Sequence, residues 1–239
     1  MAEVKNINAL SMESIDLDEV YQQPEQGKIL MNDDIVFVMG GHLQNTRFLL
    51  EGKIYQMVEP RLILALKGHA DICVNLQDCH VEKGSVMLLP TDTIVEIKEI
   101  SEDARVVAIV FRDGMDIMDE IVVSTSPSEF ARLMRIVYLA WDFIQIKPYR
   151  TKTIQNLLQS IVTDIQYLSD LEEGNTKHDS TSHLHDLFLQ FKRLVHRHCT
   201  HERSIPFYDE QLHVTPHHLS AIIQKASGKS VMHWVNRAT

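Results

Sequence analysis

The sequence predicts an α+β protein with an all-β N-terminal part, a pair of helices and an all-α C-terminal part that contains a helix-turn-helix. Three observations support this prediction: β-rich runs separated by turn residues over 29–112, helical periodicity after Pro127, and two short helices around a tight turn over 211–230. A chain of 239 residues is long enough for one large or two ordinary domains.

Composition narrows the class of protein. The chain has 44% hydrophobic and 23% charged residues, which is typical of a globular protein and not of a disordered one. No apolar run approaches the roughly 18–20 residues that span a bilayer, and residues 1–20 carry acidic and polar breaks where a secretory signal would be apolar. Cys73, Cys79 and Cys199 form no CxxC pair, which favours reduced thiols. We therefore expect a cytoplasmic protein with no membrane partner.

Residues 29–125 are expected to form the β domain. Its β-rich runs lie at 34–40, 45–59, 61–77, 80–90, 93–100 and 105–112. Several of them alternate between apolar and polar residues, and turn residues recur about every 8–12 positions, which is typical of a β-sandwich or barrel. Residues 1–28 are polar and acidic with little periodicity, so we expect a loosely docked arm with one short helix.

Two amphipathic helices are expected over 128–146 and 151–172, within a helical element spanning 126–172. The first places these residues on one face: Phe130, Leu133, Met134, Val137, Tyr138, Trp141 and Ile144. Ser126 or Ser128 is the expected N-cap, with Pro127 in the first turn and Pro148 ending the helix. Residues 173–182 are polar and lack periodicity, so we expect a linker there.

Residues 183–239 differ in charge from the rest of the chain. They hold seven Lys and Arg against four Asp and Glu, in a protein of net charge −10. Only this part therefore suits a polyanion such as DNA. A first helix is expected to bury Leu187, Phe188, Phe191, Leu194 and Val195. A short second helix is expected to begin near 204–206. In the exposed third helix, Thr215 is the expected N-cap, Pro216 takes the first position, and Gly228 is the C-cap. A compact three-helix unit that exposes one short helix has the geometry that fits a major groove.

Residues 184–237 resemble the first helix-turn-helix of the AraC/XylS transcriptional regulators. The resemblance rests on the turn at Thr215 and Pro216, on Leu219, and on the ending over 225–230. It implies a sequence-specific DNA-binding transcription regulator. Family members carry two such units joined by a long helix. Residues 230–239 resemble the start of that helix, so we expect only the first unit here and weak binding to double-stranded DNA.

The same resemblance assigns roles within the exposed helix. His217, Ser220 and Ala221 would meet base edges, where Ala can touch a thymine methyl but cannot form a hydrogen bond. Contacts to phosphate, which position the protein without reading sequence, would come from Thr215, Lys225, Lys229 and Ser230. His218 and Gln224 complete the expected DNA-binding set.

The β-rich region resembles the cupin-like effector domain of the same family. The match covers 66–75 and 80–90, with Gly68 and Gly84 at turns and Pro90 after a strand. It implies a β-barrel that senses a small-molecule effector, and homodimerisation through helices 128–172. Alternation suggests four residues that would line the interior, although core packing is the competing interpretation: Phe48, Tyr55, Arg61 and Met87. We expect no cofactor.

Two other functions remain open. One is a cupin-type small-molecule-binding protein or enzyme with a helical tail, which a metal at His69 or His80 would support. Metal-binding cupins carry an HxH motif, however, and the predicted barrel has lone histidines instead. The other is an interaction protein that dimerises with full-length partners. The histidine-rich run 196–201 does not converge on one helix face, and no catalytic set stands out, so we predict neither a metal nor an enzyme.

Overall fold

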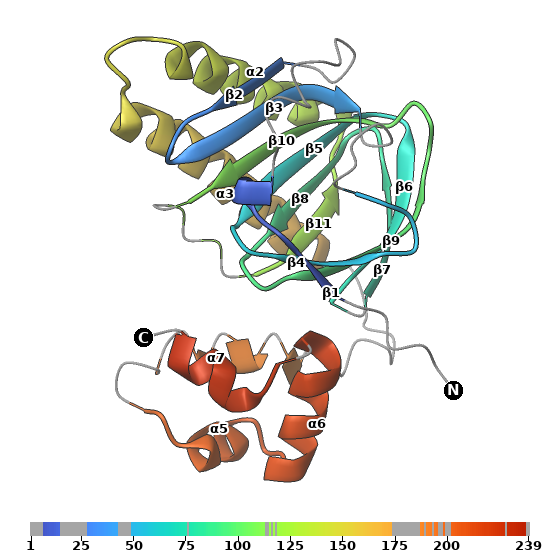
Figure 1. The fold of residues 1–239 in the computed structure, drawn as a ribbon, viewed down its shortest axis with the longest axis vertical. Coiled ribbons are helices and arrows are strands. Elements are labelled where there is room, and N and C mark those ends of the chain that lie inside the picture. Colours follow the sequence, from blue (N-terminus) through green and yellow to red (C-terminus); the bar gives the residue numbers. More distant parts are fainter. Residues whose placement is uncertain are drawn as a thin grey trace. The chain divides into compact units, whose positions relative to one another are not determined.

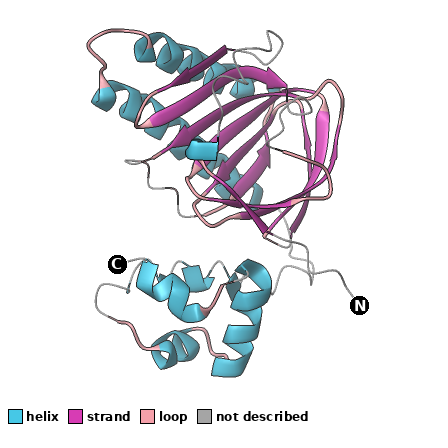
Figure 2. Ribbon diagram, viewed as in Figure 1, coloured by secondary structure: helices cyan, strands magenta, loops and turns pink. Residues whose placement is uncertain are grey.

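The computed structural model describes residues 7–14, 28–42, 49–75, 77–112, 115, 117, 119–173, 187–188, 190–192, 194–195, 198, 202–227 and 229–237. The chain divides into two compact units, residues 1–74 with 78–176 and residues 75–77 with 177–239 (Figure 1). The first unit contains the two sheets and two long helices. Within the described residues of 187–237, every element of secondary structure is a helix (Figure 2). None of the described helices is both long enough and apolar enough to cross a bilayer.

The strands of the first unit form two sheets. The five-stranded sheet has the order β1 (Ile7–Leu10), β4 (Ile54–Met57), β9 (Ile94–Ile100), β6 (His69–Val74) and β7 (Gln77–Glu82). The six-stranded sheet has the order β11 (Ile121–Ser124), β8 (Ser85–Leu89), β5 (Arg61–Lys67), β10 (Arg105–Phe111), β3 (Ile35–His42) and β2 (Lys28–Met31). The fold is therefore α+β as predicted. Hydrogen bonding joins the described strands into two sheets, so the predicted closed barrel is not confirmed.

Strand β5 of the six-stranded sheet separates two hydrophobic cores. Leu62 and Leu64 belong to the core shared with the helices, whereas Ala65 belongs to the core that faces the five-stranded sheet. Strand β8 pairs antiparallel with β5 and is buried at all five positions, because both of its faces are covered. This explains why β8 lacks the polar alternation of a half-exposed strand.

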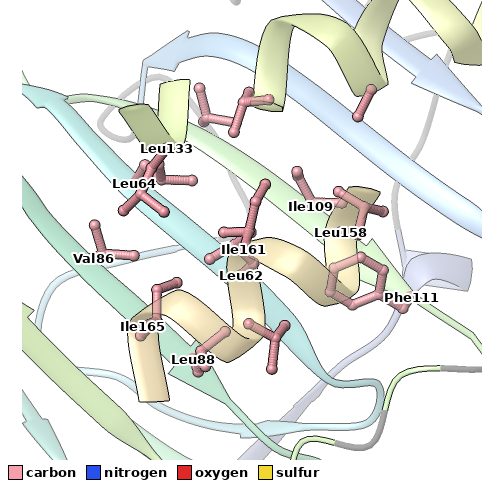
Figure 3. Packing of buried hydrophobic residues seen from close by; sticks show 14 of the residues in the cluster. Leu62, Leu64, Val86, Leu88, Ile109, Phe111, Leu133, Leu158, Ile161 and Ile165 are labelled. Atoms are coloured by element: carbon pink, nitrogen blue, oxygen red, sulfur yellow. The ribbon is translucent and has the colours of Figure 1, made fainter. Parts of the chain in front are cut away.

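Helices α2 (Pro127–Ile144) and α3 (Thr151–Glu173) cover one face of the six-stranded sheet (Figure 3). The predicted N-cap is confirmed: Ser126 accepts a hydrogen bond from the backbone N–H of Glu129, whose carboxylate accepts one from Ser126 N. Hydrogen bonding of the carboxylate to the Ser126 side chain, and then to the Ser126 backbone N–H, lowers the pKa of the Glu129 carboxyl. The helix ends at Ile144, before the predicted residue 146. Tyr138, which the periodicity placed on the apolar face of this helix, is 55% exposed.

Part of the N-terminal arm is docked more firmly than predicted. Strand β1 runs parallel to β4, and a 3-10 helix follows at Met12–Ser14. Met12 is buried, and its backbone N–H donates to both carboxylate oxygens of Glu59, at 3.2 and 3.1 Å. Strand β1 therefore belongs to the five-stranded sheet, whereas Met12 packs against Val36 and Val110 of the six-stranded sheet. Apart from residue 173, which ends α3, the linker predicted over 173–182 lies outside the described residues.

The second unit has one hydrophobic core. Its helices are α5 (Ile205–Gln211), α6 (Pro216–Ser227) and α7 (Val231–Arg237), and the described residues over 187–198 are also helical. The core includes the predicted Leu187, Phe188, Phe191 and Val195, and Leu194 packs against it. Helix α6 contributes Leu219, Ile222 and Ile223 to the same core. The predicted C-cap Gly228 lies outside the described residues.

Candidate DNA-reading helix and ligand cavity

Helix α6 is fixed at its start by a cap and a tight turn. The hydroxyl of Thr215 accepts a hydrogen bond from the backbone N–H of His218 at 3.3 Å, and Pro216 takes the first helical position. The turn from α5 places His213 at a positive φ of 54° and closes with a bond from Val214 N to Asp209 O at 3.1 Å. The cap and the turn therefore fix the start of α6 relative to the end of α5.

The face of α6 opposite the core is polar and exposed. Thr215 and six residues of the helix lie on it: His217, His218, Ser220, Ala221, Gln224 and Lys225. Of the remaining predicted DNA contacts, Ser230 is exposed and Lys229 is half-buried. This one short helix thus presents imidazole, hydroxyl, amide and ammonium groups, which suit base edges and phosphates.

Ser230 also has a structural role that the sequence reasoning missed. Its hydroxyl accepts a hydrogen bond from the backbone N–H of His233 at 3.1 Å, so Ser230 caps the start of α7. The sequence carried a signal for this, since a Ser directly before a helix is a preferred N-cap.

Ser227, which is buried, is a second serine with a structural role. Its hydroxyl donates to Ile223 O at 2.7 Å and accepts from the indole N–H of Trp234 at 2.9 Å. The backbone N–H of Lys229 also donates to it, at 3.3 Å. One hydroxyl therefore links the end of α6 to α7. The family resemblance included Ser227 among the residues that end α6 and gave no hint of this contact.

Asp209 is an unusual residue in the second unit. Its side chain is 4% exposed, and neither carboxylate oxygen has a hydrogen-bond partner in the described part of the chain. Burial raises the pKa of the Asp209 carboxyl, and the neighbouring Glu210 adds to the effect. The sequence gave no sign of this residue, because an acidic group in a short helix is ordinarily solvated.

A cavity of about 80 Å³ lies between the two sheets of the first unit. Its wall is mainly apolar and includes Met57, Ile72 and Ile97 from the five-stranded sheet and Ile63, Met87 and Leu89 from the six-stranded sheet. The predicted ligand residues Arg61 and Met87 line this cavity. Tyr55 lies in the core, where its hydroxyl accepts from Leu50 N at 2.8 Å, and Phe48 lies outside the described residues.

Arg61 is one of the residues that line this cavity, and its guanidinium is buried. The residue is 7% exposed, and one guanidinium nitrogen donates to Leu10 O at 2.9 Å. The Glu59 carboxylate lies 3.9 Å from the same nitrogen. Burial lowers the pKa of the Arg61 guanidinium to about 10, and the charge of Glu59 opposes that change.

His69 and His80, where a bound metal would support the alternative of a cupin-type protein, lie together on the five-stranded sheet. His69 stacks on His80, with ring centroids 5.8 Å apart. His80 Nδ1 lies 2.6 Å from an oxygen of Asp71, and this hydrogen bond raises the pKa of the imidazole. Within the described ranges, no group of three His, Cys, Asp or Glu side chains could hold a metal ion. In the run 196–201 only His198 is described.

Comparisons with known proteins give only distant likenesses. No family model matches the sequence, and no curated protein matches it. Among solved structures, ToxT from Vibrio cholerae O395 is similar at 10% identity and a TM-score of 0.34, over 80% of this chain and 97% of that one. The AraC-like transcriptional activator CuxR is similar at 9% identity and a TM-score of 0.40, over 75% of this chain and 65% of that one. Scores below 0.5 do not establish a shared fold or function.

Proposed function

We propose that this chain is a DNA-binding transcription regulator of the AraC/XylS type. In this proposal α6 enters the major groove and the first unit senses a small-molecule effector. The observation that carries the proposal is the division of α6 into two faces: Leu219, Ile222 and Ile223 are buried, while the opposite face is exposed and polar. A short capped helix held in this way by its neighbours suits insertion into a groove.

The side chains of α6 suggest how DNA would be read. Gln224 carries an amide that can bond bidentately to adenine, and His217 and Ser220 offer single hydrogen bonds to base edges. Lys225 and Lys229 would contact phosphates, which fix register and orientation. Few phosphate contacts predict modest affinity and a shallow dependence on salt.

The helices of the first unit offer a way to strengthen this binding. Four large apolar side chains of α2 and α3 are exposed: Tyr138, Leu139, Tyr167 and Leu171. A dimer formed through these helices would bring two copies of α6 to one DNA molecule and raise the effective concentration of the second. An effector would act by binding more tightly to one arrangement of the dimer than to another.

Fluorescence anisotropy with duplex DNA from upstream of the chain's own gene tests the proposal. Lys225→Ala is expected to weaken binding to all duplexes and to lower the salt slope by about one. Gln224→Ala is expected to cost roughly 1–3 kcal/mol on the preferred sequence and little on random DNA. The matched control is Lys152→Ala, which removes an exposed lysine of α3.

The control should bind DNA as the unchanged chain does. The DNA-reading role of α6 would be rejected if the chain bound no DNA at low salt, or if Lys225→Ala and Lys152→Ala behaved alike. In that case a cupin-type small-molecule-binding protein becomes the better proposal, since the cavity between the sheets favours it independently of α6.

A further inference from the structure

Histidine is concentrated in the part of the chain that holds α6. Nine of the 13 histidines lie over 183–239: His183, His185, His196, His198, His201, His213, His217, His218 and His233. The same segment holds seven Lys and Arg against four Asp and Glu. Histidine is the side chain whose ordinary change of charge falls between about pH 5 and pH 8. Mild acidification would therefore add more positive charge to this segment than its Lys and Arg residues supply in excess.

Three of these histidines are exposed at the start of α6. His217 and His218 lie in its first turn, and His213 lies in the turn that precedes it. None of the three imidazoles has a hydrogen bond or an ion pair with another residue in the described part of the chain. Lys225 is the one Lys or Arg in the sequence of α6. Protonated imidazoles would therefore supply most of the positive charge of this helix and its preceding turn.

The elements that pack against α6 carry both signs of charge. The described side chains on them that carry charge near neutral pH are Lys192, His198, Asp209, Glu210, Lys229 and His233. Ordinary carboxyl groups titrate below about pH 5, outside the range in which imidazoles titrate. Asp209 differs, because burial raises the pKa of its carboxyl toward that range. A test of the three histidines must therefore leave Asp209 unchanged.

Two opposing interactions act on an imidazolium ion at the start of α6. The partial positive charge of a helix N-terminus makes protonation about two- to fivefold less favourable at an exposed position. On DNA, each phosphate that a cation neutralises raises the affinity about eightfold at about 0.1 M salt, because counterions are released. The phosphate contact is the larger effect, so protonation is favoured once DNA is bound. Proton binding and DNA binding then strengthen each other reciprocally.

We propose that His213, His217 and His218 contact DNA as imidazolium ions, so that the chain takes up protons when it binds DNA and binds DNA more tightly under mildly acidic conditions. The inference rests on the proposed function, because it adds regulation by pH to the same helix. A neutral imidazole offers one donor and one acceptor, whereas an imidazolium offers two donors and a charge that attracts phosphate. The gain in affinity therefore applies to duplexes of any sequence.

Fluorescence anisotropy on the full chain with a short duplex of random sequence tests the inference, at about pH 6 and about pH 8 in about 0.1 M salt. The affinity is expected to be about 10- to 100-fold higher at the lower pH, with a steeper salt slope. The triple variant His213→Asn, His217→Gln and His218→Gln should lose most of this ratio. Asn is chosen at position 213 because the backbone there has a positive φ of 54°, which Asn tolerates.

The matched control is the double variant His69→Gln and His80→Gln, which removes two exposed histidines of the first unit. It should keep the full ratio of affinities between the two pH values. Lys225→Ala should lower the affinity by similar factors at both pH values, because an ordinary ammonium group stays charged over this range. An unchanged ratio in the triple variant, or an equal loss of the ratio in the double variant, would overturn the proposal.

Proton uptake provides a second readout, which does not depend on how tightly each variant binds. Isothermal titration calorimetry in buffers of different ionisation enthalpy counts the protons taken up as the chain binds the duplex. The natural chain is expected to take up about one proton or more at about pH 7, and the triple variant close to none. Equal uptake by the two chains would assign the protons to other groups, such as Asp209, and would contradict the proposal.

The two proposals fail in distinguishable ways. A chain that binds DNA with equal affinity at both pH values, without proton uptake, keeps the proposed function and loses this inference. A chain that binds no DNA at either pH in low salt loses the proposed function, and this inference with it.

Discussion

Asp209 is a charged side chain in a position that suits an apolar one. It is 4% exposed and its carboxylate oxygens have no described partner, so burial raises the pKa of the carboxyl above 3.8. A carboxyl with a raised pKa binds its proton more tightly in the folded state than in the unfolded state. The free energy of unfolding therefore falls as pH rises from about 3.8 to the raised pKa, and stays lower above it.

Replacing Asp209 with an uncharged residue should remove this fall in the free energy of unfolding. Asp209→Ala is expected to raise the free energy of unfolding at pH 7 by roughly 1–3 kcal/mol, with a smaller gain near pH 4. Urea unfolding followed by Trp234 fluorescence in a Trp141→Phe background measures this, because the chain has two tryptophans. Glu210→Ala, which changes an exposed neighbour, should have little effect. A variant less stable than the natural chain at pH 7 would show that the carboxylate is stabilised in the folded protein.

Arg61 shows how far sequence reasoning reaches at this scale. Alternation predicted that Arg61 would line the interior of a barrel, and the residue lines the cavity between the two sheets. The same reasoning placed Tyr55 in the ligand site, but its hydroxyl is bonded to Leu50 N within the core. Periodicity gives the direction of a side chain. Whether space is left beside it depends on packing between distant strands, which one sequence does not encode locally.

At the scale of elements, the junction of α6 and α7 depends on the hydroxyl of Ser227. Ser227→Ala would leave the indole N–H of Trp234 buried without its acceptor. We expect this to lower the free energy of unfolding of the second unit by about 1–3 kcal/mol. Urea unfolding in the Trp141→Phe background again reports on Trp234. Ser220→Ala, on the exposed face of the same helix, should change the free energy by less than about 0.5 kcal/mol. Equal effects of the two substitutions would argue against the hydroxyl as the link.

The elements that the sequence predicted are those with strong local signals. The runs at 93–100 and 105–112 became β9 and β10, and the capped run after Ser126 became α2. Strand β1 was missed because its partner β4 lies far along the chain and runs parallel, so no adjacent turn marks the pairing. Strand β2 could have been predicted, because Asn32 directly after it is a residue type that forms turns between strands. In the structure its side chain accepts hydrogen bonds from the N–H groups of Asp34 and Ile35.

At the scale of the whole molecule, charge and apolar surface are distributed unequally along the chain. The chain has net charge −10, yet residues 183–239 hold seven Lys and Arg against four Asp and Glu. Half of the large exposed hydrophobic side chains among the described residues lie between Tyr138 and Leu171. The acidic first unit repels DNA and so lowers the DNA affinity of a single chain. A second copy of α6 on the same DNA would therefore raise the affinity of the proposed regulator most.

Leu139→Glu tests whether α2 and α3 supply that second copy. Leu139 is 45% exposed on α2, and a buried glutamate in each partner would disfavour a symmetric dimer contact. Sedimentation velocity is expected to show two chains for the unchanged protein and one for the variant. Met31→Glu, at an exposed apolar residue of the edge strand β2, should remain dimeric. DNA affinity and its salt slope should fall with Leu139→Glu alone, because one α6 then contacts about half as many phosphates. If the variant stayed dimeric, Leu139 would not lie in the dimer contact. If it became monomeric without losing DNA affinity, dimerisation through these helices would not contribute to DNA binding by α6.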